Sequence, residues 1–212
     1  GVQLTGDDGA PERTAVEPVE GPSLLGAKLV QPDSPVDVVA RPGTDQLFVV
    51  ERLGTVRRLD GGSLSAPVLD LRAQLTASLE WGLLGLTFSP DGGRAYLNET
   101  DGLETRIHEF EVADDGEFDA GTARIVYRFD QPAEAHNGGD LLFGPDGLLY
   151  VFTGDGGGDR SDEELGGAWN SDIARHALAL DSPLGKILRI DPTPSAGASF
   201  TVPSDNPFVD VD

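Results

Sequence analysis

Short apolar runs with a two-residue period follow one another from about Leu24 towards the end of the chain. Clusters of Gly, Pro and Asp separate these runs. Alternation of apolar and polar positions is typical of half-buried strands, and such clusters favour turns. The pattern therefore predicts an all-β fold of short antiparallel strands.

One layout occurs three times: a strand, a turn built on Pro with Gly or Asp, and a second strand ending in polar residues. The copies are VVARPGTDQLFVVER (38–52), LTFSPDGGRAYLNET (86–100) and LLFGPDGLLYVFTGD (141–155). Their prolines, Pro42, Pro90 and Pro145, lie 48 and 55 positions apart. That spacing is close to the ~40–50 residues of a four-stranded propeller blade. The repeat therefore predicts a β-propeller, with an antiparallel sandwich as the alternative.

Each copy is followed by two segments that resemble the outer strands of a blade. These segments are 55–60 and 67–71, then 105–112 and 122–129, then 185–192 and 199–203. The chain thus holds about three blades, whereas a closed ring needs about four to eight. We expect the remaining blades to come from a continuing or a second chain.

Residues 1–22 are acidic and show no apolar period, which predicts a tail or tether ahead of a propeller domain at 23–212. The whole chain has a formal net charge of −22, from 37 acidic and 15 basic residues. Such a surface repels nucleic acid and anionic lipid. It fits either adaptation to concentrated salt or simply acidic bacterial loops. The chain has no cysteine, and no apolar run is long enough to span a bilayer.

The strongest candidate for chemistry is His136, in a glycine-rich turn before the strand at 139–143. Asp155 ends the next strand, 148–154, and the two strands form a hairpin across Gly144–Gly147. The start of one strand then lies beside the end of the other, so His136 and Asp155 should be neighbours at one rim. A carboxylate beside a histidine sets its tautomer and prepares it as a general base. The alternative is an ordinary loop histidine.

Glu80 precedes the second copy's first strand at the position that His136 occupies in the third copy. We expect both to project towards one central channel, unless Glu80 is only a solvated loop carboxylate. His108 shares a strand face with Phe110 and is expected to be structural. His176 lies in a helical-turn insertion and receives no role.

Five acidic residues in and after the third copy raise the question of a calcium site: Asp155, Asp159, Asp162, Glu163 and Glu164. They lack the spacing and the closing bidentate Glu of an EF-hand loop. A solvated loop is the preferred interpretation, and we assign no metal ligand.

Four ordered motifs resemble the soluble PQQ-dependent sugar dehydrogenases, the glucose/sorbosone dehydrogenase family. They are EWGLLGLTFSPDG, HNGGDLLFGPDGLLYVFTGDGG, LGKILRIDP and VPSDNPF, within about residues 24–208. Hedgehog-interacting-protein-like domains share the same pattern. The resemblance implies a six-bladed propeller of which this chain is the N-terminal half. It also implies an extracellular or periplasmic protein, which the N-terminal tail would tether to the cell surface.

The resemblance also implies roles for three residues. His136 matches the family's catalytic histidine, which takes the sugar's hydroxyl proton while a hydride passes to the quinone. Asp155 matches the carboxylate that orients it, and Glu80 stands where glucose-oxidising members have a glutamine near the substrate. Ala135 replaces an Asp that often contacts a sugar hydroxyl, which argues against glucose itself.

The family's cationic elements for holding PQQ and calcium fall beyond Asp212. PQQ carries three carboxylates and requires such cations. We therefore expect this chain alone to bind PQQ weakly.

Three functions compete at this stage. The first is PQQ-dependent oxidation of an aldose to its lactone. The second is a non-catalytic propeller of the hedgehog-interacting sort, which binds a protein or glycan through its rim. The third, less favoured, is a calcium-dependent lactonase, which would need a central cage of Glu, Asn and Asp.

If the acidic surface is a salt adaptation, the chain should melt at lower temperature in dilute buffer than in molar salt, because screening relieves its self-repulsion. Relief of ~1–2 kcal/mol would shift the melting temperature by several degrees. Thermal denaturation at low and molar sodium chloride measures this. A melting temperature insensitive to salt would contradict the adaptation.

Overall fold

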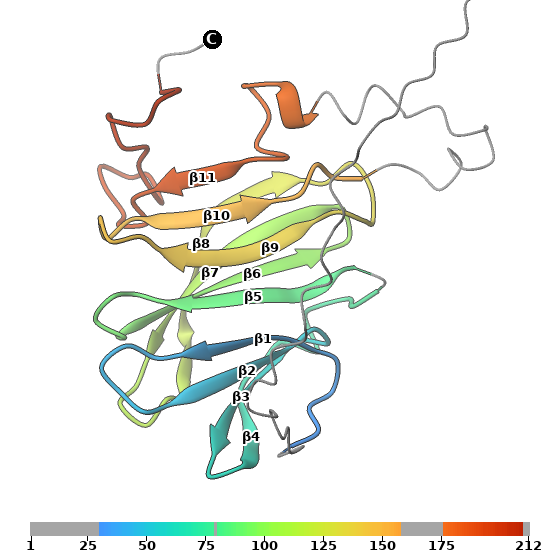
Figure 1. Ribbon diagram of the computed structural model, residues 1–212, viewed down its shortest axis with the longest axis vertical. Coiled ribbons are helices and arrows are strands. Elements are labelled where there is room, and N and C mark those ends of the chain that lie inside the picture. Colours follow the sequence, from blue (N-terminus) through green and yellow to red (C-terminus); the bar gives the residue numbers. More distant parts are fainter. Residues whose placement is uncertain (1–29, 79, 158–175, 210–212) are drawn as a thin grey trace, which may run out of the picture.

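The protein is described by a computed structural model that covers residues 30–78, 80–157 and 176–209. These residues form antiparallel strands joined by short turns (Figure 1). The strands are β1 Pro35–Ala40, β2 Leu47–Glu51, β3 Thr55–Asp60, β4 Ser63–Asp70, β5 Gly82–Phe88, β6 Arg94–Asp101, β7 Glu104–Val112, β8 Phe118–Asp130, β9 Gly138–Phe143, β10 Leu149–Thr153 and β11 Ile187–Ile190. The predicted tail at 1–22 lies outside the described residues.

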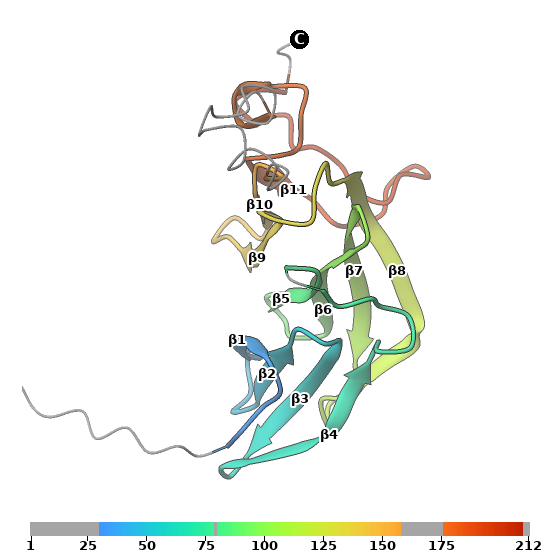
Figure 2. The ribbon, with the colours of Figure 1, turned by 90° about the vertical axis from the view of Figure 1, so that its right-hand side faces the viewer.

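The strands make three sheets, each with its strands in chain order. Two sheets have four strands, β1-β2-β3-β4 and β5-β6-β7-β8, and the third joins β9, β10 and β11. Figure 2 shows β1, β5 and β9 gathered on one side of the molecule and β4 and β8 on the other. We call the sheets blades 1, 2 and 3. Stacked meanders with their first strands together form part of a β-propeller, and the predicted all-β propeller fold with about three blades is confirmed.

Apolar side chains between neighbouring blades form the core. One cluster joins blades 1 and 2 around four aromatic rings, Phe48, Phe88, Phe110 and Phe118. A second joins blades 2 and 3 and includes Tyr96, Ile107, Leu141, Leu149 and Val151. Blade 2 is covered on both faces, so its strand β6 is buried along six consecutive positions. Such a strand loses the simple alternation that marks a half-exposed strand.

The first strands of blades 2 and 3 approach so closely that only glycine fits between them. A Cβ added at Gly85 would lie 2.2 Å from the carbonyl oxygen of Gly139. A Cβ added at Gly139 would lie 2.6 Å from the Cβ of Leu84. This contact fixes the spacing of the two blades next to the rim that carries His136.

A buried arginine ties blades 1 and 2 together at the opposite rim. Arg41, 6% exposed, lies in the turn between β1 and β2. Its guanidinium donates to the carbonyl oxygens of Gly92 at 2.8 Å, Val112 at 3.2 Å and Ala113 at 2.7 Å. Since a buried guanidinium must satisfy its donors, this side chain holds two turns of blade 2 in place.

One predicted strand is wrong. Segment 199–203 was expected to be the fourth strand of blade 3, but among the described residues it joins only through the isolated bridge between Asp191 and Thr201. Phe200 instead packs on Tyr127 of blade 2, with ring centroids 5.2 Å apart, and Arg124 donates to the carbonyl of Ser199. Phe200 is therefore packed against another blade, while Val202 of the same segment stays 51% exposed.

Phe48→Ala should be strongly destabilising, because the ring is 0% exposed and lies at the centre of the cluster between blades 1 and 2. The expected loss in the free energy of unfolding is about 3–5 kcal/mol, measured by urea denaturation. Phe208→Ala is the matched control, since Phe208 is 63% exposed. That change should stay within about 0.5 kcal/mol. Equal losses for both variants would contradict this placement of the core.

Candidate active site

His136 lies in the loop that leads into β9, at the rim where β9 begins and β10 ends. Gly138 at the start of β9 pairs with Thr153 at the end of β10. The hairpin therefore returns Asp155 to the place where the chain left His136, as the sequence predicted. The His136 side chain is 62% exposed, so solvent and small molecules reach the ring.

The backbone at His136 is in the left-handed region, with φ of 58°. A side chain in this region costs of order 1–3 kcal/mol and persists only where neighbouring contacts hold it. One contact comes from the glycine-rich strand end, where the N–H of Gly156 donates to the His136 carbonyl at 3.2 Å. A Cβ at Gly154 would lie 1.7 Å from that same carbonyl oxygen, so only glycine is possible there.

Asp155 accepts a hydrogen bond from the His136 ring. Its Oδ1 lies 2.9 Å from Nδ1, and the same oxygen accepts the N–H of Gly157 at 3.0 Å. Burial would raise the pKa of Asp155, but the Gly157 N–H and the His136 ring outweigh it and hold that pKa below its ordinary value. An ionised Asp155 makes Nδ1 the protonated nitrogen and leaves Nε2 with a free lone pair.

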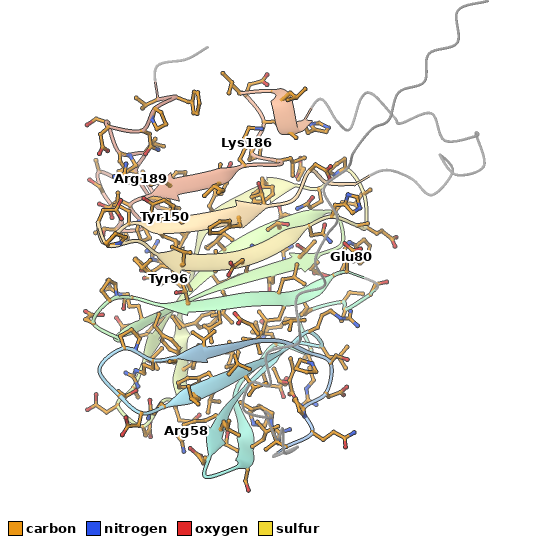
Figure 3. The ribbon with its side chains drawn as sticks, viewed as in Figure 1. Arg58, Glu80, Tyr96, Tyr150, Lys186 and Arg189 are labelled. Atoms are coloured by element: carbon orange, nitrogen blue, oxygen red, sulfur yellow. The ribbon has the colours of Figure 1, made fainter. Side chains whose placement is uncertain are left out.

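The side chain of Glu80 forms a hydrogen bond with the backbone of His136. Its Oε2 accepts the N–H of His136 at 2.6 Å, across the boundary between blades 2 and 3. Figure 3 shows Glu80 beside the strand ends at this rim. The structure thus brings together all three residues singled out in the sequence, His136, Asp155 and Glu80. Their chemical roles remain predictions.

Two supporting residues were not anticipated. Asn137, 2% exposed, donates from Nδ2 to the carbonyls of Glu80 at 3.2 Å and Glu134 at 3.4 Å, and its Oδ1 is buried without a protein partner among the described residues. Arg52 of blade 1 donates to the carbonyls of Ser78 and Trp81. Asn137 follows His136 directly in HNGGD, a signal that sequence reasoning could have used. Arg52 gives no such signal, because its role depends on the neighbouring blade.

The other histidines lie away from this site. His108 on β7 is paired with the buried Glu99, with Nε2 2.9 Å from Oε1, and it stacks on Phe110. That arrangement agrees with the structural role expected for it. Residues 176–178 are helical, and the Nδ1 of His176 lies 3.5 Å from the hydroxyl of Ser182.

Carboxylates rather than cations surround the candidate base. Among the described residues, no arginine or lysine forms an ion pair with Glu80 or Asp155. Two described cations are engaged elsewhere: Arg52 as above, and Lys186 with the carbonyls of His176, Ala177 and Leu184. The described residues therefore place an oriented histidine at this rim, but they do not provide the cations that the three carboxylates of PQQ would require.

No metal cage is evident in the part of the chain that the structure describes, where no three His, Cys, Asp or Glu side chains converge. Asp159, Asp162, Glu163 and Glu164 of the acidic loop lie outside the described residues. Within the same described ranges, no helix is long and apolar enough to cross a membrane.

Solved structures with a similar fold are sugar dehydrogenases. The PQQ-bound form of an aldose sugar dehydrogenase from Streptomyces coelicolor matches with a TM-score of 0.64 at 25% identity, covering 84% of this chain and 52% of that one. An oxidoreductase described as a glucose dehydrogenase from Thermus thermophilus matches with a TM-score of 0.64 at 28% identity, covering 87% and 51%. The chain thus spans about half the length of these proteins.

The curated relatives carry a different name. Mouse Hedgehog-interacting protein is 31% identical over 188 residues, which cover 78% of this chain and 25% of that protein. The HIPL2 protein of Arabidopsis thaliana is 26% identical over 256 residues, covering 90% and 35%. The chain therefore spans about a quarter to a third of the length of these relatives.

Asp155→Asn should destabilise the chain in a pH-dependent way. A carboxyl whose native pKa lies below its ordinary value adds stability above that ordinary value and loses it as the pH falls through the native one. The difference in unfolding free energy from the unmodified protein should be under about 1 kcal/mol near neutrality, because the pair is exposed. It should shrink in acid, below the ordinary value of 3.8. Denaturant unfolding from neutral to acidic pH measures it.

Glu134→Gln controls for the loss of one negative charge in the same loop, and its stability difference should not follow this profile. A difference for Asp155→Asn that is constant across the pH range would contradict an ionic bond to His136.

A sequence profile connects these observations. The profile described as Glucose / Sorbosone dehydrogenase matches residues 32–212, almost all of the predicted propeller domain. The match includes every strand described above and the loops that carry Glu80, His136 and Asp155. The chain belongs to the glucose/sorbosone dehydrogenase family.

Proposed function

We propose that this chain supplies the catalytic base of a PQQ-dependent dehydrogenase that oxidises an aldose to its lactone. The observation that carries the proposal is the exposed His136, whose Nδ1 is bonded to Asp155 so that the lone pair lies on Nε2. Membership of the family and the fold shared with sugar dehydrogenases support it.

The chemistry assigned to this chain is the removal of a proton. Nε2 of His136 accepts the proton of the hydroxyl on the sugar's anomeric carbon, and that carbon gives up a hydride as its C–O bond becomes a carbonyl. Asp155 stabilises the imidazolium that forms, because it is held ionised 2.9 Å from Nδ1. PQQ, when bound, would supply the electron acceptor.

The described residues alone do not account for the binding of PQQ and calcium. The carboxylates at the rim disfavour a tri-anionic ligand, and no described arginine or lysine pairs with Glu80 or Asp155 there. We propose that residues outside the described ranges, in this or a second chain, provide the cations that PQQ needs. We place the activity outside the cytoplasm, where related sugar-oxidising propellers are expected.

A second function is favoured by the curated relatives. Mouse Hedgehog-interacting protein matches more than three quarters of this chain, which suggests a non-catalytic propeller that binds a protein or glycan through its rim. The two functions make opposite predictions for redox activity. The His136 and Asp155 pair favours the enzyme, because a binding surface does not require an oriented base.

His136→Ala should reduce the rate of PQQ-dependent dye reduction by about 10²–10⁴-fold, the usual contribution of a general base. The assay uses this chain, or the longest native polypeptide that contains it, with PQQ, calcium chloride and a panel of aldoses. His108→Gln is the control, since His108 lies on β7 beside Glu99 and should leave the rate unchanged.

Activity that His136→Ala does not diminish would overturn the assignment of the base. The absence of dye reduction and of PQQ binding in the longest native polypeptide would reject the enzyme and favour the rim-binding function.

A further inference from the structure

We propose that Glu80 is a positioning residue that holds the backbone of His136 in its left-handed conformation and so aims the imidazole, and that it acts in this way rather than only as a substrate ligand. The inference deepens the proposed function and rests on it for its catalytic meaning. The claim that Glu80 fixes the backbone of His136 rests only on the contacts described below.

The first support is the contact itself. The carboxylate Oε2 of Glu80 accepts the backbone N–H of His136 at 2.6 Å. A hydrogen bond to an ionised acceptor is shorter and stronger than one between neutral groups. This acceptor therefore defines where the peptide plane before His136 points.

The second support is the unusual backbone that the contact accompanies. His136 has φ of 58°, and it is the one non-glycine residue at this site with a positive value among those described. Because a residue other than glycine leaves this region readily when its neighbours allow it, the conformation needs bonds on both sides. Glu80 binds the N–H of His136, and Gly156 binds its carbonyl.

The third support is a second bond between the same two loops. The Nδ2 of Asn137 donates to the backbone carbonyl of Glu80 at 3.2 Å. Asn137 is 2% exposed, so its side chain cannot swing into solvent. Glu80 is thus held at its carbonyl while its carboxylate holds the next loop, and the two bonds form a clamp across the boundary between blades 2 and 3.

The clamp is itself braced from blade 1. The carbonyl of Trp81, next to Glu80, accepts from Arg52 at 3.1 Å, and the N–H of Leu83 donates to the Arg52 carbonyl at 2.9 Å. A Cβ at Gly82 would lie 2.2 Å from that carbonyl. The position of Glu80 therefore depends on the packing of blades 1 and 2, and through Glu80 the position of His136 does as well.

The consequence for the ring is specific. Rotation of the His136 backbone would carry the imidazole away from Asp155, whose own carboxylate is fixed by the N–H of Gly157. Nδ1 would then lose the acceptor that sets its tautomer. Glu80 thereby influences which ring nitrogen carries the proton without touching the ring.

The test uses NMR of the chain without cofactor. In Glu80→Ala, the amide of His136 should exchange with solvent about tenfold or more faster, because its acceptor is gone. The ring ¹⁵N shifts should move from the Nδ1-protonated tautomer towards a mixture. Glu80→Gln retains an acceptor oxygen and should restore most of both signals. Glu134→Ala is the control, since it removes a carboxylate from the loop of His136 itself, and it should change neither.

Unchanged exchange and ring shifts in Glu80→Ala would overturn the proposal. Faster exchange spread evenly over the amides of β9 and β10 would also overturn it, since that result reports general loss of structure. Where a preparation is active, Glu80→Ala should lower kcat more than it raises KM, with recovery in Glu80→Gln. A rise in KM alone with unchanged NMR would make Glu80 only a substrate ligand.

These readouts separate the two proposals. If His136→Ala retains full activity, the proposed base is wrong while the NMR result still decides whether Glu80 positions His136. If the NMR result fails while His136→Ala abolishes activity, the base stands and the positioning role falls.

Discussion

The candidate site depends on how closely the first strands of blades 2 and 3 approach each other. Gly85 and Gly139 leave no room for a side chain between β5 and β9, and their backbones meet directly. A Cβ at either position would force the two backbones apart. At this spacing a glutamate that precedes β5 reaches the amide of a histidine that precedes β9. The arrangement of His136 is thus a result of packing between blades and not of its own loop alone.

The described residues include two histidine–carboxylate pairs, and accessibility distinguishes them. His108 and Glu99 are 2.9 Å apart, but their side chains are only 18% and 8% exposed. There, burial would raise the pKa of Glu99, while His108 and Arg106 outweigh it and lower that pKa. His136 and Asp155 have the same separation, but their side chains are 62% and 39% exposed. The same separation therefore stabilises the interior of blade 2 in one case, through Nε2, and leaves a ring open to solvent in the other, through Nδ1.

Sequence patterns predicted the features that depend on residues close together in the chain. The turns at Pro42, Pro90 and Pro145, the hairpins around them and the pairing of His136 with Asp155 follow from strand period and turn chemistry. The same approach failed at 199–203, whose composition suits a strand. In the structure, Phe200 packs against Tyr127 of another blade. Strand propensity indicates that a segment can form a strand, but tertiary contacts decide whether it pairs in a sheet.

The sequence by itself therefore determined the all-β class, the repeat of blades and the family, because these depend on periodicity and on motifs that are contiguous in the chain. It also brought His136 beside Asp155, since a hairpin joins its own two ends. Only the tertiary structure decided that Glu80 meets the backbone of His136, that Arg52 braces the loop beside it, and that Asn137 closes the clamp. Those contacts join residues of different blades. Their distances are set by side-chain packing in the cores between the sheets, which no local pattern encodes.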